Sequence, residues 1–242
     1  SQFKLEVKSK NWMIRGYKTL ENSGESFNAT ITARYFNELV KPSTTWYPTY
    51  TAAFVTYRDA GMNLLDAGAA ATAVADAGRP TGRIGESDLF KSVAGIPISK
   101  GGGRFLDKSQ LTVVEANYNL TELFGLEKYN ADLLVGGIIK NYSLNSQGTL
   151  FADTAGKIGI NESGAYAQLS KRYFDDILKV SFSGRYDKNE NFAGRFTPRV
   201  SAVIKVAEDN NIRVSYQQAY RFPTTQNQWI NLLVGGGTRL MG

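Results

Sequence analysis

Apolar and polar residues alternate along much of the second half of the chain. In LKVSFSGRYD, Leu178, Val180 and Phe182 would share one face of an extended strand, with polar residues between them on the other. The same period of two recurs in RVSAVIKV (199–206) and in IRVSYQQAY (212–220). The pattern predicts successive β-strands that each have one apolar and one polar face.

Four further segments show a looser alternation and are also predicted to be strands. They are FKLEVKSKNWMIRGY (3–17), QLTVVEANYNL (110–120), ADLLVGGIIKNY (131–142) and GAYAQLSKRYF (164–174). Asp175 and Asp176 follow the last of these. Adjacent residues of an extended chain point to opposite sides, so the two carboxylates do not suit acid–base work on one bond. They suit a tight turn between two strands, and the C-terminal GGGTRLMG shows no strand pattern.

A different spacing, typical of helices, runs from residue 27 to about residue 78. LLDAGAAATAVADAG (64–78) is rich in alanine, the best helix former. KPSTTWYPTY (41–50) is predicted to break this region into two helical segments, and 79–108 to be a loop with one short helix. The chain therefore divides into a helix-rich insertion, about 20–95, and a strand-rich portion, about 108–242.

The predicted connections between strands alternate between long and short. Outer-membrane barrels combine short periplasmic turns with longer extracellular loops and strands of about 10 residues. A soluble β-sandwich is not expected to alternate long and short connections in this way. The fold class expected is mainly β: an antiparallel meander from a large outer-membrane β-barrel with a helical extracellular insertion.

The amino-acid composition excludes several classes of function. The chain has no Cys and no His, which excludes a disulfide scaffold, a cysteine nucleophile, a Ser-His-Asp triad and a His-based zinc site. Its 28 basic and 22 acidic side chains give a net charge of +6 without a cationic block, so no nucleic-acid partner is predicted. No run of about 18 apolar residues suggests a transmembrane helix, and no signal-like segment begins the chain. We expect no enzyme, no catalytic residue, no metal and no cofactor.

Four local motifs are interpreted as structural. Gly101–Gly103 lacks the Lys-Ser/Thr of a phosphate loop and is predicted to be a flexible turn, as is the second glycine run in GGGT (235–238). Glu86 with Asp88, and Asp187 with Glu190, could offer oxygens to Ca²⁺, but their spacing is not that of an EF-hand.

Aromatic residues supply the only candidate ligand surface. Aromatic faces stack on sugars and organic ligands, and Arg adds fixed hydrogen-bond donors. The alternative is that the rings pack the insertion onto the barrel rim. The candidate ligand-binding residues are Arg34, Trp46, Tyr47, Tyr50, Tyr57 and Arg58. Five tyrosines near predicted strand ends suggest interfacial aromatic girdles: Tyr118, Tyr129, Tyr142, Tyr173 and Tyr186.

Several stretches resemble the TonB-dependent outer-membrane receptor family, in its Bacteroidetes-type branch. The most specific are GRYDKNENF (184–192), TPRVS (197–201) and AYRFPTT (219–225), with WMIRGYKTLENSGESFN (12–28) in support. The resemblance implies a plugged barrel of about 22 strands in the Gram-negative cell outer membrane. It also implies a receptor for the energised uptake of a scarce small-molecule or glycan ligand, such as a siderophore, cobalamin or glycan.

The predicted strands are too few to close such a barrel, and no segment resembles a plug or a TonB-contacting segment. We therefore expect an internal portion of the barrel that contacts outer-membrane lipid and reaches the TonB complex through regions outside this sequence. On this basis Val180→Arg should be costly and Ser181→Arg much less so. The alternative function is that of a soluble β-rich ligand- or carbohydrate-binding module.

Overall fold

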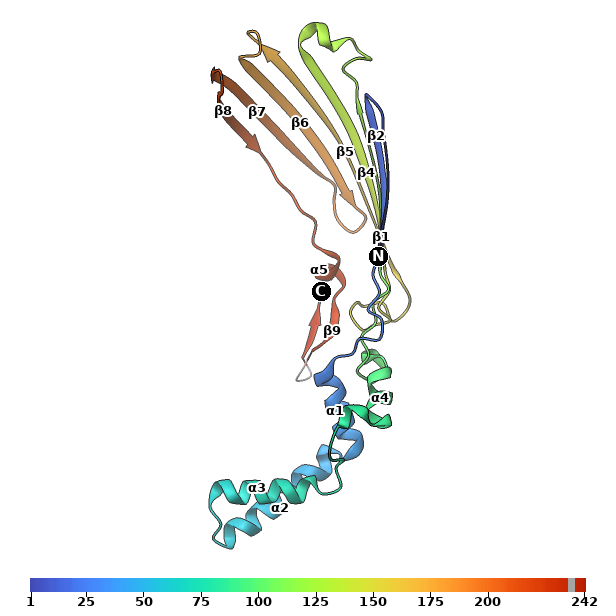
Figure 1. The fold of residues 1–242 in the computed structure, drawn as a ribbon, viewed down its shortest axis with the longest axis vertical. Coiled ribbons are helices and arrows are strands. Elements are labelled where there is room, and N and C mark those ends of the chain that lie inside the picture. The colour runs from blue at the N-terminus through green and yellow to red at the C-terminus, as the bar shows by residue number, and fades with distance from the viewer. Residues whose placement is uncertain (235–237) are drawn as a thin grey trace.

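Eight antiparallel strands form one sheet in which each strand pairs with the next in chain order (Figure 1). The computed structural model describes residues 1–234 and 238–242. The strands of this sheet are β1 (Gln2–Lys8), β2 (Trp12–Leu20), β3 (Gln110–Asn119), β4 (Ala131–Leu144), β5 (Ile158–Tyr173), β6 (Leu178–Asn189), β7 (Arg195–Ala207) and β8 (Asn210–Gln217). The predicted antiparallel meander is confirmed.

The pairing register separates the sheet into an apolar face and a polar face. Register partners share a face, and one apolar row crosses β2 to β7 through Ile14, Ala116, Gly137, Ala165, Tyr186 and Phe196. The next row belongs to the opposite, polar face and includes Arg15, Glu115, Asp187 and Arg195. Large side chains of the apolar face such as Phe182 and Phe196 are exposed. The alternation in the sequence therefore encodes the two faces.

The segment 3–17 is a hairpin, so the prediction of one strand there is wrong. β1 and β2 pair from Gln2 with Thr19 to Lys8 with Met13, and the Ser9 amide donates to the Trp12 carbonyl at 2.8 Å. The alternation does not reveal that the chain reverses direction, because apolar residues continue on both sides of a polar turn. Ser9-Lys10-Asn11 is that turn.

The connections sort to two ends of the sheet. Residues 9–11, 120–130, 174–177 and 208–209 connect strands at one end, which we call the turn end. Residues 21–109, 145–157 and 190–194 lie at the other, which we call the loop end. The two longest connections are both at the loop end, as the sequence predicted. Phe174, Asp175 and Asp176 have positive φ in the β5–β6 turn, so the predicted turn is confirmed.

The insertion between β2 and β3 carries most of the helix, extending away from the sheet at the loop end (Figure 1). Its helices are α1 (Ala29–Val40), α2 (Ser43–Asp59), α3 (Leu64–Asp76) and α4 (Asp88–Gly95). The predicted alanine-rich helix is confirmed. Residues 79–108 contain α4 and two 3-10 turns, η1 (Ile84–Glu86) and η2 (Ile98–Lys100), where one short helix was predicted. The predicted break at 41–50 is confined to Lys41 and Pro42, because Pro42 fits the helix N-cap and α2 continues through Pro48. None of the helices in the described part of the chain is long and apolar enough to cross a membrane.

A small core closes the loop end. Leu144, Leu150, Phe151 and Ile160 are buried together and contact Trp229, which ends α5 (Thr225–Trp229). The Ala152 amide donates to the Trp229 carbonyl at 2.9 Å, which ties the β4–β5 loop to the C-terminal segment. That segment contains a short hairpin of β9 (Asn231–Leu233) and β10 (Arg239–Met241), so the expectation of no strand in GGGTRLMG is wrong.

The Gly101–Gly103 run is packed, and its prediction as a flexible turn is wrong for two of the three residues. Gly102 and Gly103 are buried. A Cβ on Gly102 would lie 2.2 Å from the Ile96 carbonyl oxygen, and one on Gly103 would lie 1.7 Å from the Thr32 hydroxyl. Glycine is required there because the chain passes directly against α1 and the end of α4. Residues 235–237 of the second glycine run lie outside the described residues.

Candidate functional site

A cavity of about 410 Å³ lies on the polar face near the loop end. Side chains on the polar face of β4, β5 and β6 form its floor. The segment that follows β8, residues 218–224, forms its cover, and we call it the return segment. The floor includes Lys140, Tyr142, Glu162, Arg185 and Asp187, and the cover includes Tyr220, Arg221 and Phe222.

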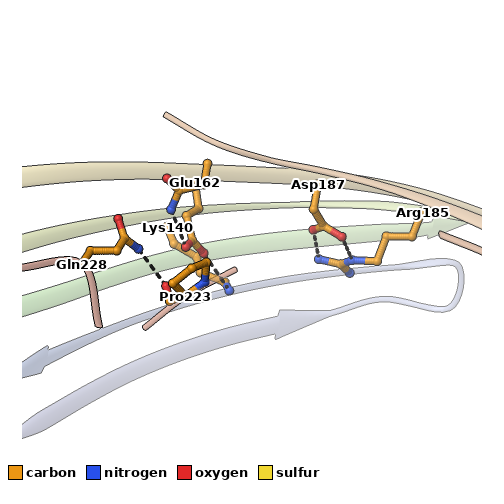
Figure 2. Close-up of polar contacts among 7 residues, drawn as sticks. Lys140, Glu162, Arg185, Asp187, Pro223 and Gln228 are labelled. Atoms are coloured by element: carbon orange, nitrogen blue, oxygen red, sulfur yellow. Dashed lines mark hydrogen bonds and ion pairs between the residues drawn. The ribbon is translucent and has the colours of Figure 1, made fainter. Parts of the chain in front are cut away.

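Strand register brings Lys140, Glu162 and Asn189 side by side. Lys140 of β4 pairs with Glu162 of β5, and Glu162 pairs with Asn189 of β6. The Lys140 Nζ lies 3.2 Å from Glu162 Oε2, and the Asn189 amide donates to Glu162 Oε1 at 2.8 Å (Figure 2). Both carboxylate oxygens of Glu162 are thus held in place. Each oxygen has a further lone pair that can accept a hydrogen bond from a ligand in the cavity.

Arg185 and Asp187 form a two-point ion pair along one strand. Arg185 Nε donates to Asp187 Oδ2 at 2.7 Å, and Nη2 donates to Oδ1 at 2.6 Å (Figure 2). Gly164 faces them from β5, where a Cβ would lie 2.3 Å from Asp187 Oδ1 and 2.9 Å from Arg185 Nη2. Glycine at this position lets the planar pair lie flat over the strand.

Aromatic contacts hold the return segment over the polar face. Phe222 stacks on Phe192 of the β6–β7 loop with ring centroids 6.0 Å apart, and Tyr220 meets Phe222 edge to face at 5.0 Å. The Arg195 guanidinium lies 5.2 Å from the Tyr220 ring. Gln228 donates to the Pro223 carbonyl at 2.7 Å, which fixes the end of the segment to α5 (Figure 2).

The cavity combines cations, carboxylates and aromatic rings. Lys140, Arg185 and Arg221 bring positive charge, and Glu162 and Asp187 bring negative charge. Such a lining offers many hydrogen-bond donors and acceptors with little net charge, which suits a polar ligand rich in hydroxyl groups. The sequence pattern placed Arg185 and Asp187 on the polar face of their strand, but it gave no face to Lys140 and left Glu162 and Arg221 in connections. Only the register shows that the floor residues meet.

The structure brings three of the predicted ligand-binding residues together on α2. Trp46 stacks on Tyr50 at 5.3 Å with an interplanar angle of 7°, and Tyr47 meets Trp46 edge to face at 5.1 Å. The Trp46 indole donates to Asp76 Oδ1 of α3 at 2.7 Å. These rings therefore contact each other and α3. The alternative suggested by the sequence was that they pack the insertion onto the barrel rim. Tyr47 remains 64% exposed.

The other three predicted residues lie apart from this cluster. Tyr57 and Arg58 are near the far end of α2, about 17 Å along the helix from Trp46 at 1.5 Å per residue. The Arg58 guanidinium donates to the Met62 carbonyl at 2.6 Å and thereby ties the α2–α3 connection to the end of α2. Arg34 is exposed on α1. Glu38, one turn further along α1, accepts a hydrogen bond from Ser43 that holds the pKa of its carboxyl below the ordinary value and fixes the corner to α2.

The register decides on which face four of the predicted girdle tyrosines lie. Tyr142 pairs with Ile160 and lies on the polar face in the cavity, so its assignment to an outward girdle is wrong. Tyr118, Tyr173 and Tyr186 lie on the apolar face, as a girdle requires. Within residues 1–234 and 238–242, no group of three or more acidic side chains is placed to hold a metal ion.

The fold and its two faces define a class of protein. A chain-order antiparallel sheet with one exposed apolar face and one charged face is typical of the wall of a transmembrane β-barrel. The family described as TonB dependent receptor-like, beta-barrel, matches residues 6–239, and the chain belongs to this family. Its members are transporters of the Gram-negative outer membrane that work with TonB. No match to the chain was found among curated proteins.

Proposed function

We propose that this chain forms one sector of the wall of a TonB-dependent transporter whose barrel is closed by further strands. The sheet runs from β1 to β8, and these two edge strands do not pair with each other in the described residues. Unpaired strand edges are not tolerated within hydrocarbon, and barrels of this size class have about 22 strands. Additional strands at both edges would satisfy the backbone groups of β1 and β8.

The loop end is the extracellular side in this proposal. Outer-membrane barrels carry their long connections outside the cell, and the helical insertion and the β4–β5 loop share the loop end. The cavity under the return segment then faces the outer part of the barrel lumen. A soluble carbohydrate-binding module is disfavoured, because no second layer covers the exposed apolar face within the described residues.

We further propose that the transported ligand is a glycan, in preference to a siderophore or cobalamin. The observation that carries this choice is the cavity lining, in which Glu162 and Asp187 accept hydrogen bonds and Lys140 and Arg185 donate them next to an aromatic cover. Sugar hydroxyls both donate and accept, and sugar rings stack on aromatic faces. The TonB complex would act through regions outside this sequence, by driving rearrangement of the plug.

The cavity is tested in the complete barrel by replacing its charged floor. Glu162→Gln combined with Arg185→Gln should weaken the binding of an oligosaccharide about tenfold or more, because hydrogen bonds to charged groups are lost. Calorimetric titration with oligosaccharides, ferric siderophores and cobalamin measures this effect. Arg199→Gln is the matched control, since Arg199 is an exposed charged residue of the polar face that does not line the cavity. Tight binding of a siderophore or cobalamin that the double variant leaves unchanged would contradict the glycan assignment.

The insertion is proposed to make the first contact with the ligand through its aromatic cluster and the nearby arginines: Arg34, Trp46, Tyr47, Tyr50, Tyr57 and Arg58. Tyr47→Ala should weaken oligosaccharide binding severalfold without loss of helix, because the ring is exposed while Trp46 and Tyr50 hold α2 to α3. Titration calorimetry and circular dichroism measure the two effects. Leu65→Ala, at an exposed position of α3 outside the cluster, is the control. Equal affinities of Tyr47→Ala and the parent protein would remove Tyr47 from the binding surface.

A further inference from the structure

Two lysines lie over two exposed tyrosines at the turn end of the β4–β5 pair. The Lys128 Nζ is 5.0 Å from the centroid of the Tyr129 ring, and the Lys171 Nζ is 5.2 Å from the centroid of the Tyr173 ring. Tyr129 is 57% exposed and Tyr173 is 40% exposed. Each ammonium group is thus held against an aromatic face that is open to the surroundings.

The strand register places both pairs at one corner of the sheet. Lys171 lies between Ala131 and Val180 on the apolar face, and Tyr173 pairs with Leu178 on the same face. The short helix η3 (Leu126–Tyr129) leads directly into β4. The Arg172 amide donates to the Asn130 carbonyl at 2.8 Å, which fixes η3 against the end of β5. The two lysine–tyrosine pairs are therefore neighbours where the apolar face ends.

Acidic groups near this corner are directed elsewhere or are solvent-exposed. Asp132 and Asp176 pair with Arg172, at 3.4 Å and 3.5 Å, and Asp132 belongs to the polar face. Glu127 and Asp175 are exposed. Neither Lys128 nor Lys171 forms an ion pair within the described part of the chain. The corner thus has two lysines without ion-pair partners beside apolar surface, and the exposed carboxylates of Glu127 and Asp175 lie in the adjoining turns.

We propose that Lys128 and Lys171 bind the phosphate of an anionic phospholipid in the periplasmic leaflet of the outer membrane. Tyrosines at the edge of a barrel's apolar face lie at the level of lipid headgroups, and the short turns of such barrels lie on the periplasmic side. Long lysine stems lie along apolar surface while the ammonium group reaches the interface. A lipid phosphate at that depth would be bound by both ammonium groups, and its acyl chains would continue along Leu133 and Leu169 of the apolar face.

This inference rests on the proposed membrane position of the sheet, and the test separates the two. The complete barrel is inserted into nanodiscs that contain phosphatidylglycerol and phosphatidylcholine, and native mass spectrometry counts the phosphatidylglycerol molecules that remain bound. Each lysine near the membrane surface contributes about fivefold to the binding of an anionic lipid. Lys128→Gln with Lys171→Gln should therefore reduce retention of phosphatidylglycerol about ten- to thirtyfold. Lys18→Gln, an outward lysine at the loop end, should leave it unchanged.

Three other outcomes have distinct meanings. A barrel that fails to insert contradicts the proposed function. A barrel that inserts and retains phosphatidylglycerol equally in the parent and the double variant overturns this inference alone. Displacement of the bound lipid by soluble glycerol phosphate at millimolar concentration would also overturn it, because a lipid site depends on acyl-chain contact with the apolar face as well as on the phosphate.

Discussion

Ala167→Arg is expected to destabilise the membrane-inserted barrel by about 2–4 kcal/mol, whereas Gln168→Arg should cost well under 1 kcal/mol. The two residues are neighbours on β5, both exposed, and they point to opposite faces. Ala167 pairs with Val135, which lies midway along the apolar run of β4 from Ala131 to Ile139. Arginine at position 167 would therefore lie near the middle of the hydrocarbon, and arginine at position 168 in the wet lumen.

The free energy of unfolding in lipid vesicles, measured by denaturant titration, checks this prediction. Equal costs at the two positions would indicate a soluble sheet with no lipid-facing side. Ala167 and Gln168 separate the lipid face from the lumen face more clearly than Val180 and Ser181, the pair that the sequence suggested. Val180 lies directly beside Lys171 in the register, close to the interface, where an added charge costs less. Ser181 hydrogen-bonds Ser170, which is 3% exposed, so Ser181→Arg would disturb packing as well as change charge.

Periodicity alone was sufficient for most of the fold. The strict alternation in β6 and β7 gave both the strands and the composition of their faces, because a half-buried strand has a side-chain period of two. The alanine-rich α3 was equally clear. The β1–β2 hairpin was missed because its turn, Ser9-Lys10-Asn11, has no glycine or proline, the residues that most clearly mark a reversal.

The cavity could not be predicted from the sequence because it depends on the exact pairing register of β4, β5 and β6 and on the position of the return segment. Lys140 and Glu162 are in contact only because β4 and β5 pair with one particular offset. A shift of one residue would move Glu162 to the apolar face. The position of the return segment could not be predicted either, because it depends on the stacking of Phe222 on Phe192, a contact between two loops that no local sequence pattern indicates. Gly164 likewise has no explanation in the local sequence, because its role depends on the ion pair that lies over it.

The loop between β4 and β5 is organised around one buried carboxylate. Asp153 is 4% exposed and accepts hydrogen bonds from the Ser146 hydroxyl at 2.7 Å, the Gly148 amide at 2.7 Å and the Gln147 amide at 3.1 Å, as well as from the Ser146 amide. The loop so formed holds Thr149, whose hydroxyl accepts from the Leu106 amide at 3.0 Å and donates to the Leu106 carbonyl at 2.6 Å. Asp153 therefore supports the junction between the barrel and the helical insertion.

Asp153→Ala should cost about 3 kcal/mol of local stability, because three backbone amides would lose their acceptor in a buried site. Amide hydrogen exchange of Ser146, Gln147 and Gly148 should become about a hundredfold faster, and protease cleavage in 145–157 should increase. Asp209→Ala, an exposed residue of the β7–β8 turn, is the matched control and should change neither. If exchange at Ser146 and Gly148 stays slow in Asp153→Ala, the apolar packing of Leu150 and Phe151 is sufficient to hold the loop. In that case the carboxylate does not anchor the insertion to the barrel.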